Sequence, residues 1–146
     1  MPVDALSEIV INRARPDVAA YAANPERASA WYASVDEVEW RTEPRLEVGS
    51  RVAFVNYAAR KKAEFVFEVC DYVPGERLVM RSVEGSFPME TTYTWEDAGE
   101  LATRMTLRNR GEPTGVLKLV APLLVPAMRR SINKDLARLK RLLERA

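Results

Sequence analysis

Residues that could carry out chemistry are few in this sequence, because its 146 residues include no histidine. This absence excludes Ser-His-Asp and Cys-His catalysis, histidine acid–base chemistry and histidine metal sites. The single cysteine, Cys70, has no histidine to activate its thiol, and Glu68 and Asp71 lack a second acid at a recognisable spacing. The sequence contains no phosphate-binding loop, dinucleotide fingerprint or zinc motif, so we expect no metal and no organic cofactor.

Four polar residues are predicted to share one face of a sheet with large apolar side chains: Asn56, Thr91, Tyr93 and Asn109. A buried polar side chain needs a hydrogen-bond partner. These four could bond to one another, to water or to the carbonyl group of a ligand, and the sequence leaves these alternatives open. The Tyr93 phenol is the candidate catalytic group, as a proton donor in a cyclisation.

The elements that position these residues follow from the periodicity of the chain. Residues 7–13 predict a strand, and residues 18–23 and 26–31 predict two short helices, separated at Asn24-Pro25. Apolar and polar residues then alternate, which predicts six strands at 34–43, 50–58, 62–72, 77–83, 89–96 and 101–110. Their turns are too short for parallel crossovers, so we expect an antiparallel meander. A long helix is expected over about 114–144, within a single domain that spans residues 1–146.

Alternation also assigns the two faces of the sheet. The polar face carries acidic and basic strands in turn, which predicts a solvated ladder of cross-strand ion pairs; an anion site built from the arginines is the alternative. The apolar face is either a filled core or the wall of a cavity. Its expected members are Val38, Trp40, Val52, Phe54, Asn56, Phe65, Phe67, Met80, Met89, Thr91, Tyr93, Met105, Leu107 and Asn109, with Leu101 also on this side.

The last helix should cover that apolar face, because its apolar residues recur at three- and four-residue spacing. They are Leu117, Ala121, Leu124, Met128, Ile132, Leu136, Leu139 and Leu143. From Pro113 on, eight basic residues stand against two acidic ones, a net charge of +6. A stripe of cations could contact RNA, a ribosome or an anionic membrane, but a solvated face is the plainer interpretation and nucleic acid is not the expected partner. The stripe comprises Arg130, Lys134, Arg138, Arg141 and Arg145.

Two prolines, Pro122 and Pro126, lie in the most apolar part of this helix. A proline inside a helix removes one backbone hydrogen bond and costs roughly 3 kcal/mol. Both would free carbonyls on the same side, which predicts a bend rather than an end, and the bend is where a cavity could open. The alternative is a break near Pro122, with Pro122 in the first turn of a new helix.

Composition bounds the remaining possibilities. The net charge is +1, so no global field demands an anionic partner. One cysteine fits a reducing compartment, and the first residues, MPVDALSEIV, lack the basic start and apolar run of a signal peptide. The longest apolar stretch, residues 116–128, contains Lys118 and is too short to span a membrane. We therefore expect a cytoplasmic protein without a transmembrane segment.

The order of one strand, two small helices, six strands and one long helix resembles the START-like, polyketide cyclase/dehydrase-like superfamily, also called SRPBCC. The residues that carry the resemblance are SEIVINRARPDVAAYAANPERASAWY, FEVCDYVPGERLVMRS, TTYTWEDAGELATRMTLRNRG and the terminal helix. The VPGERL turn and the TYTWED strand end are similar to common family patterns. These motifs occupy structural positions, so they specify the fold better than the activity.

The resemblance implies an α+β helix-grip fold, in which a curved seven-stranded antiparallel sheet wraps around a long C-terminal helix. It also implies a cavity between them for a hydrophobic or amphipathic small molecule. Members of the superfamily include carriers, coenzyme Q chaperones, stress-response cochaperones and aromatase/cyclases. Binding, as a carrier or sensor, is the favoured function; a polyketide cyclase/dehydrase-like enzyme and an interaction module that uses the basic helix are alternatives. The expected ligand-binding residues are Trp40, Phe54, Asn56, Phe65, Phe67, Met80, Met89, Thr91, Tyr93, Met105, Asn109, Leu117, Ala121, Leu124 and Met128.

Overall fold

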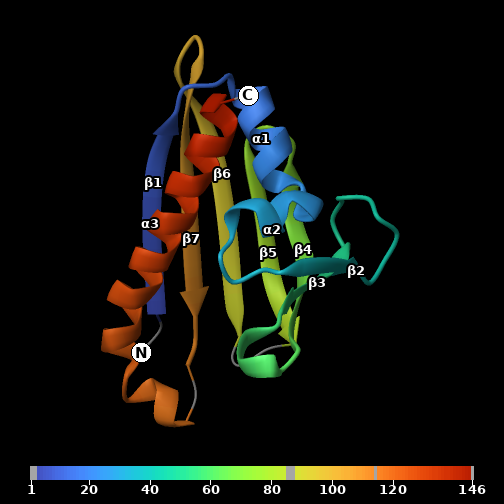
Figure 1. The fold of residues 1–146 in the computed structure, drawn as a ribbon, viewed down its shortest axis with the longest axis vertical. Helices are drawn as coiled ribbons and strands as arrows, with labels where there is room; N and C mark the ends of the chain where they lie inside the picture. Colours follow the sequence, from blue (N-terminus) through green and yellow to red (C-terminus); the bar gives the residue numbers. More distant parts are fainter. Residues whose placement is uncertain (1–2, 85–87, 114, 146) are drawn as a thin grey trace.

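The computed structural model describes residues 3–84, 88–113 and 115–145, without the side chains of residues 59, 84, 116 and 117. Its elements follow the predicted order (Figure 1). They are β1 (Val3–Ile11), α1 (Arg15–Ala23), η1 (Pro25–Arg27), α2 (Ala28–Trp31), β2 (Glu37–Trp40), β3 (Arg51–Asn56), η2 (Ala58–Arg60), β4 (Ala63–Val73), β5 (Arg77–Glu84), β6 (Met89–Gly99), β7 (Ala102–Gly111), η3 (Gly115–Lys118) and α3 (Ala121–Arg145).

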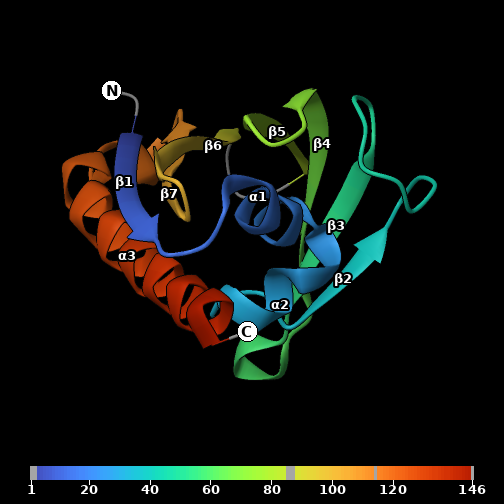
Figure 2. The ribbon, with the colours of Figure 1, turned by 90° about the horizontal axis from the view of Figure 1, so that it is seen from above.

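The seven strands form one antiparallel sheet in the order β1-β7-β6-β5-β4-β3-β2. Strands β2 to β7 therefore each pair with their chain neighbour, as the short turns require, and β1 lies beside β7. In the turn between β4 and β5, Gly75 has a φ of +79°, a conformation that glycine adopts without steric cost. Figure 2 shows the sheet curving around α1 and α3, which is the helix-grip arrangement.

The C-terminal half of α3 is fastened to the start of the chain. Ile132, Leu136, Leu139 and Leu143 are buried on its inner side. Arg13 donates a hydrogen bond to the Leu143 carbonyl at 2.7 Å, and Lys140 donates one to the Val10 carbonyl at 2.6 Å. These bonds and the apolar stripe hold this half of the helix against β1.

Strand β2 is shorter than the predicted 34–43, and the start of β1 and the position of Leu101 also differ from the sequence predictions. Strand β1 begins at Val3 rather than residue 7, because the alternation of inward Val3, Ala5 and Ser7 continues to the N-terminal side and pairs with β7 throughout. Leu101 was expected on the inner face, and this prediction is wrong. It lies in the turn between β6 and β7, outside both strands, and its side chain is 73% exposed.

The predicted bend in the long helix is also wrong, and the alternative of a break is confirmed. The chain forms η3, leaves helical structure, and starts α3 at Ala121, so Pro122 lies in the first turn. The Leu123 and Leu124 backbone N–H groups both donate to the Val120 carbonyl, which anchors this turn. Pro122 costs little there, because the second residue of a helix has no helical carbonyl partner for a backbone N–H, so the missing N–H breaks no helical bond. Pro126 alone lies inside the helix.

The outer face of the sheet carries the predicted ladder of ion pairs. Arg81 pairs with Glu90 across β5 and β6, and Arg104 pairs with Glu96 across β6 and β7, both at 3.9 Å. The guanidinium group of Arg108 forms a two-pronged bond with Asp4 at 2.6 and 2.8 Å. These three arginines are therefore matched by carboxylates, which favours the ladder over an anion site.

Candidate functional site

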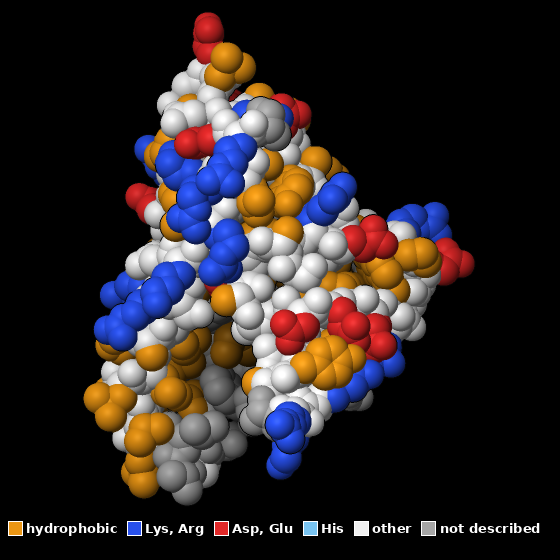
Figure 3. Space-filling view, in the orientation of Figure 1, with side chains coloured by type: hydrophobic (Ala, Val, Ile, Leu, Met, Phe, Trp, Pro, Cys, Tyr) orange, Lys and Arg blue, Asp and Glu red, His pale blue; other side chains and the backbone are white. Residues whose placement is uncertain are grey.

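The inner face of the sheet is packed at one end and open at the other. The end near the C-terminus of α3 is solid, and its side chains are at most 3% exposed: Trp95, Met105, Leu107, Leu136 and Leu139. At the end near the N-terminus of α3, inward side chains keep access to solvent: Phe54, Phe65, Phe67, Met89, Asn109, Leu124, Val125 and Met128. Figure 3 shows a hollow there, beside the lower part of the molecule, with hydrophobic side chains on its walls.

Strand register places the predicted sheet residues on one face. Val38 is opposite Phe54, Phe54 is opposite Phe65, and Val52 is opposite Phe67. On the other side of the sheet's midline, Met80 is opposite Thr91, Thr91 is opposite Asn109, and Tyr93 is opposite Leu107. Residues paired in this way point to the same side of a sheet, so the face assignment made from alternation is confirmed.

The predicted ligand-binding residues divide by burial. Met80, Thr91, Tyr93, Met105 and Ala121 are buried, and Met105 lies at the solid end. Trp40 is half-buried on the edge strand β2, where its indole N–H donates to the Glu26 carboxylate at 3.4 Å. The Leu117 side chain lies outside the described residues. The others border the open end, where Phe54 and Phe67 meet edge to face at 5.8 Å.

Asn56 and Thr91, two of the predicted polar residues, form hydrogen bonds with different parts of the structure. The Asn56 amide donates to the Ser34 carbonyl at 2.9 Å and accepts from the Ala58 N–H at 2.9 Å. Asn56 is therefore occupied by the local turn. The Thr91 hydroxyl donates to the Asn109 side-chain oxygen at 2.7 Å. Within the described part of the chain, the Asn109 amide nitrogen has no partner, which leaves two donors beside the hollow.

Tyr93 shares a hydrogen bond of 2.5 Å with a second phenol, Tyr32, which follows α2. The Trp31 and Trp95 rings each lie 6.0 Å from the Tyr93 ring. Burial raises the pKa of both phenols, and the neighbouring Tyr93 raises the pKa of Tyr32 further. Both hydroxyls therefore stay protonated near neutral pH and can donate a proton in a hydrogen bond, but neither is a ready base.

Asp135 on α3 holds the Tyr32 segment in place. Its carboxylate accepts from the Ala33 backbone N–H at 3.1 Å, and Arg138 reaches from α3 to the Trp31 carbonyl at 2.7 Å. Burial is the largest influence on the Asp135 carboxyl group and raises its pKa, although the Ala33 N–H and Arg138 act in the opposite direction. This side chain is 4% exposed, so it functions as a structural tie between α2 and α3.

Sequence reasoning missed Trp31, Tyr32 and Asp135 as parts of this cluster. Trp31 and Tyr32 stand at the end of a four-residue helix, which is too short to show a periodic face. Asp135 was counted only as a charge on the helix, although it sits between Ile132 and Leu136 on the buried side. The adjacent AWY aromatic pair and a carboxylate within an apolar stripe were the available signals.

Cys70 has the inert character expected from the absence of histidine. Its thiol is half-buried and lies 3.5 Å from the Val79 carbonyl. Burial raises the pKa of the thiol, so the nucleophilic thiolate is scarce near neutral pH.

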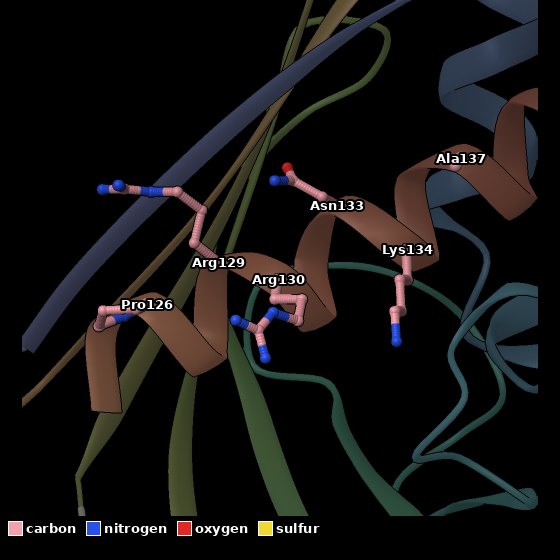
Figure 4. Close-up of a pocket in the computed structure, with 6 residues that line it drawn as sticks. All are labelled: Pro126, Arg129, Arg130, Asn133, Lys134 and Ala137. Carbon is pink, nitrogen blue, oxygen red and sulfur yellow. The ribbon is translucent and has the colours of Figure 1, made fainter. Parts of the chain in front are cut away.

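A second depression lies on the outer side of α3. It is an open groove of about 500 Å³, and its lining residues are Pro126, Arg129, Arg130, Asn133, Lys134 and Ala137 (Figure 4). The predicted cation stripe is not continuous beyond this groove, because Arg138 turns inward to Trp31 and Asp135. The cations of the groove are thus separate from those near the C-terminus.

The comparison with known families agrees with this architecture. Residues 3–144 match the family described as polyketide cyclase / dehydrase and lipid transport, and the chain belongs to this family. A search of curated proteins found no sequence match. No helix in the described ranges is both long and apolar enough to cross a membrane.

Solved structures share the fold at low sequence identity. The protein TTHA0849 from Thermus thermophilus is 23% identical over 94% of each chain, with a TM-score of 0.77. The Zhui aromatase/cyclase from Streptomyces sp. R1128 is 14% identical, with a TM-score of 0.80 over 99% of this chain and 95% of that one. The di-domain aromatase/cyclase BexL from the BE-7585A biosynthetic pathway is 14% identical, with a TM-score of 0.79 over 97% of this chain and 46% of BexL.

Proposed function

We propose that this protein binds a hydrophobic or amphipathic small molecule in the hollow between the open end of the sheet and the N-terminal half of α3. One observation carries the proposal. The inner faces of the sheet and of α3 are packed solid at one end, yet the same faces leave Phe54, Phe67 and Met128 only half-buried at the other. An apolar concavity with few polar groups is the usual form of a small-molecule site.

The polar groups of the hollow suggest how such a ligand is oriented. The free donors of Asn109 suit a carbonyl or hydroxyl oxygen, while the aromatic and methionine side chains suit a flexible apolar body. The ligand-binding residues that we propose are Phe54, Phe65, Phe67, Met89, Thr91, Asn109, Leu124 and Met128.

Native mass spectrometry of freshly purified protein tests this proposal. We expect an adduct of one apolar small molecule per chain, which organic extraction releases intact. The free protein should then take up a medium-chain fatty alcohol, added as a probe, to a limit of one molecule per chain. If no adduct is present and the probe adds without a limit, the protein has no defined apolar site.

A polyketide cyclase/dehydrase-like enzyme is the second candidate, and the Tyr32–Tyr93 pair is the observation that favours it. A protonated phenol can donate a hydrogen bond to a carbonyl oxygen as negative charge develops on it and then transfer the proton to give the neutral enol or alcohol, while the cavity wall restricts how a flexible chain folds. Turnover of a poly-β-ketone thioester should fall on Tyr93→Phe. Unchanged turnover in that variant would remove Tyr93 from the mechanism.

A cytoplasmic location is part of the proposal. It is supported by the single cysteine, which suits a reducing compartment. Fractionation of the native host's cells would test it.

A further inference from the structure

The N-terminal end of α3 exposes apolar side chains that nothing in the described structure covers. Leu119, just before the helix, is 83% exposed, and Leu123 in its first turn is 74% exposed. Pro122, Pro126 and Ala127 are exposed on the same stretch. We call Leu119, Pro122, Leu123, Pro126 and Ala127 the apolar tip. Figure 3 shows hydrophobic side chains gathered at this lower end of the helix, next to the hollow.

Cations directly follow the apolar tip along the outer side of the helix. Arg129, Arg130 and Lys134 line the groove of about 500 Å³, together with Asn133. At 100° per residue, Arg130 and Lys134 each lie within about 20° of Leu123 around the helix axis, so these two cations share the outer face of Leu123, whereas Arg129 lies about 120° away. In Figure 4, Arg130 and Lys134 extend to one side of the helix while Arg129 extends to the other, which spreads the positive charge.

The stretch of chain that forms this surface contains no acidic residue. Between Glu112 and Asp135 the sequence contains Lys118, Arg129, Arg130 and Lys134 and no aspartate or glutamate. Within this stretch, the only charged residues that follow the apolar tip are the cations Arg129, Arg130 and Lys134. By contrast, Arg81, Arg104 and Arg108 on the sheet are each paired with a carboxylate.

We propose that this end of α3 docks the protein on the surface of an anionic phospholipid bilayer. Leu119 and Leu123 enter the boundary between headgroups and acyl chains, and the groove holds lipid phosphates against Arg129, Arg130 and Lys134. Arg130 is seven residues from Leu123, which is about 10 Å along a helix. With the helix axis steep to the bilayer, this spacing keeps Arg130 at the headgroups while Leu123 reaches the headgroup/acyl boundary, into which interfacial helices bury apolar side chains by about 5–10 Å.

The exposed leucines favour a membrane over a nucleic acid, because leucine side chains add nothing to phosphate contacts. Docking would place the open end of the hollow against the lipid. The inference thus extends the proposed function by naming the surface from which the ligand is exchanged, and its test measures membrane binding separately from ligand binding.

Vesicle flotation tests the docking surface. Wild-type protein should float with vesicles of phosphatidylcholine containing about 30% phosphatidylserine, remain behind with pure phosphatidylcholine, and dissociate as salt is raised. Leu119→Ser with Leu123→Ser should weaken binding by about tenfold or more, because two exposed side chains no longer enter the apolar layer. Arg129→Glu with Arg130→Glu should weaken it by at least about 25-fold, from roughly fivefold per cation.

Matched controls lie at the other end of the molecule. Leu101→Ser changes an equally exposed leucine in the β6–β7 turn, and Arg141→Glu changes an exposed arginine farther along the same helix. Both should bind vesicles like the wild type. All the substituted residues are exposed, so the urea unfolding midpoint of each variant should stay at the wild-type value.

Several results would overturn the proposal. These are equal binding to neutral and anionic vesicles, unchanged binding after the leucine substitutions, an equal loss in the controls, and preferential binding to RNA. Concentration-dependent dimerisation that the leucine substitutions abolish, without vesicle binding, would assign the tip to a second copy instead. Retained uptake of an apolar probe without vesicle binding would refute docking alone, and the reverse result would refute only the proposed function.

Discussion

Removing the hydroxyl of Tyr32 and removing the hydroxyl of Tyr93 should have non-additive effects on the free energy of unfolding. The Tyr93 side chain is 4% exposed, and its only hydrogen-bond partner among the described residues is Tyr32. Tyr93→Phe removes one hydroxyl and leaves the other without its partner. A buried hydroxyl that loses its partner costs about 1–3 kcal/mol, and Tyr32 keeps some access to solvent, so we expect a loss near 1.5 kcal/mol.

The double variant separates this pairing from the packing of the rings. With Tyr32→Phe and Tyr93→Phe together, no hydroxyl is left unpaired, so the total cost should be smaller than the sum of the single costs. We expect a coupling free energy of about 1 kcal/mol. The aromatic contacts of both rings persist in every variant, because phenylalanine retains the ring.

Urea unfolding followed by circular dichroism measures each of the four free energies. Tyr21→Phe serves as the matched control, because Tyr21 is half-buried and contacts Arg27 through its ring, which the substitution keeps. It should change the free energy of unfolding by less than about 0.5 kcal/mol. Strictly additive single costs, or a Tyr93→Phe variant as stable as the wild type, would refute the paired arrangement.

Three further predictions concern α3. Leu139→Ala should cost about 3–5 kcal/mol in urea unfolding because Leu139 is fully buried, whereas Met128→Ala at the open end should cost less than half as much; equal costs would mean that both ends are filled. The folded state raises the pKa of Asp135 and therefore favours its protonated form. As pH rises from the unfolded-state pKa of about 3.9 through the raised folded-state pKa, the contribution of Asp135 to stability should fall. Asp135→Asn keeps an acceptor for Ala33 and should therefore gain stability relative to wild type from pH 4 to pH 7, and a relative loss over that window would contradict the sign. Pro126→Ala should stabilise the protein by about 1–3 kcal/mol by restoring a bond to the Pro122 carbonyl, while Pro122→Ala should change stability by less than about 0.5 kcal/mol; the reverse order would mean that the helix starts elsewhere.

The inner face of the sheet was predictable because strand alternation has a period of two. Once Tyr93 and Trp95 were assigned inward, the faces of the neighbouring strands followed from short turns and antiparallel pairing. The ladder of charges on the outer face follows from the same alternation. Which face each strand residue takes is a local property, so the alternation of apolar and polar residues predicts it directly.

Other features depend on distant parts of the chain. Tyr32 meets Tyr93 only because Asp135 and Arg138, more than one hundred residues later, hold the end of α2. The sequence reasoning chose a bend over the break before α3, and this choice was wrong because a proline that is costly inside a helix is nearly neutral in its first turn, and local sequence does not show where the helix starts. The hollow depends on how completely side chains from several strands and a helix fill the space between them. The periodicity of the sequence gives no information on that volume.

The most direct test of the binding site compares α3 variants in their affinity for a neutral apolar fluorophore, N-phenyl-1-naphthylamine. Met128→Trp should fill the hollow without overpacking the core, because Met128 is half-buried at the open end. Leu123→Trp enlarges a side chain on the outer face of the same helix and serves as the control. We predict saturable binding of one fluorophore per wild-type chain, weakened at least about tenfold by Met128→Trp alone, since the added ring occupies the ligand's volume. Non-saturable binding, or equal affinity in wild type and Met128→Trp, would contradict a ligand site in the hollow.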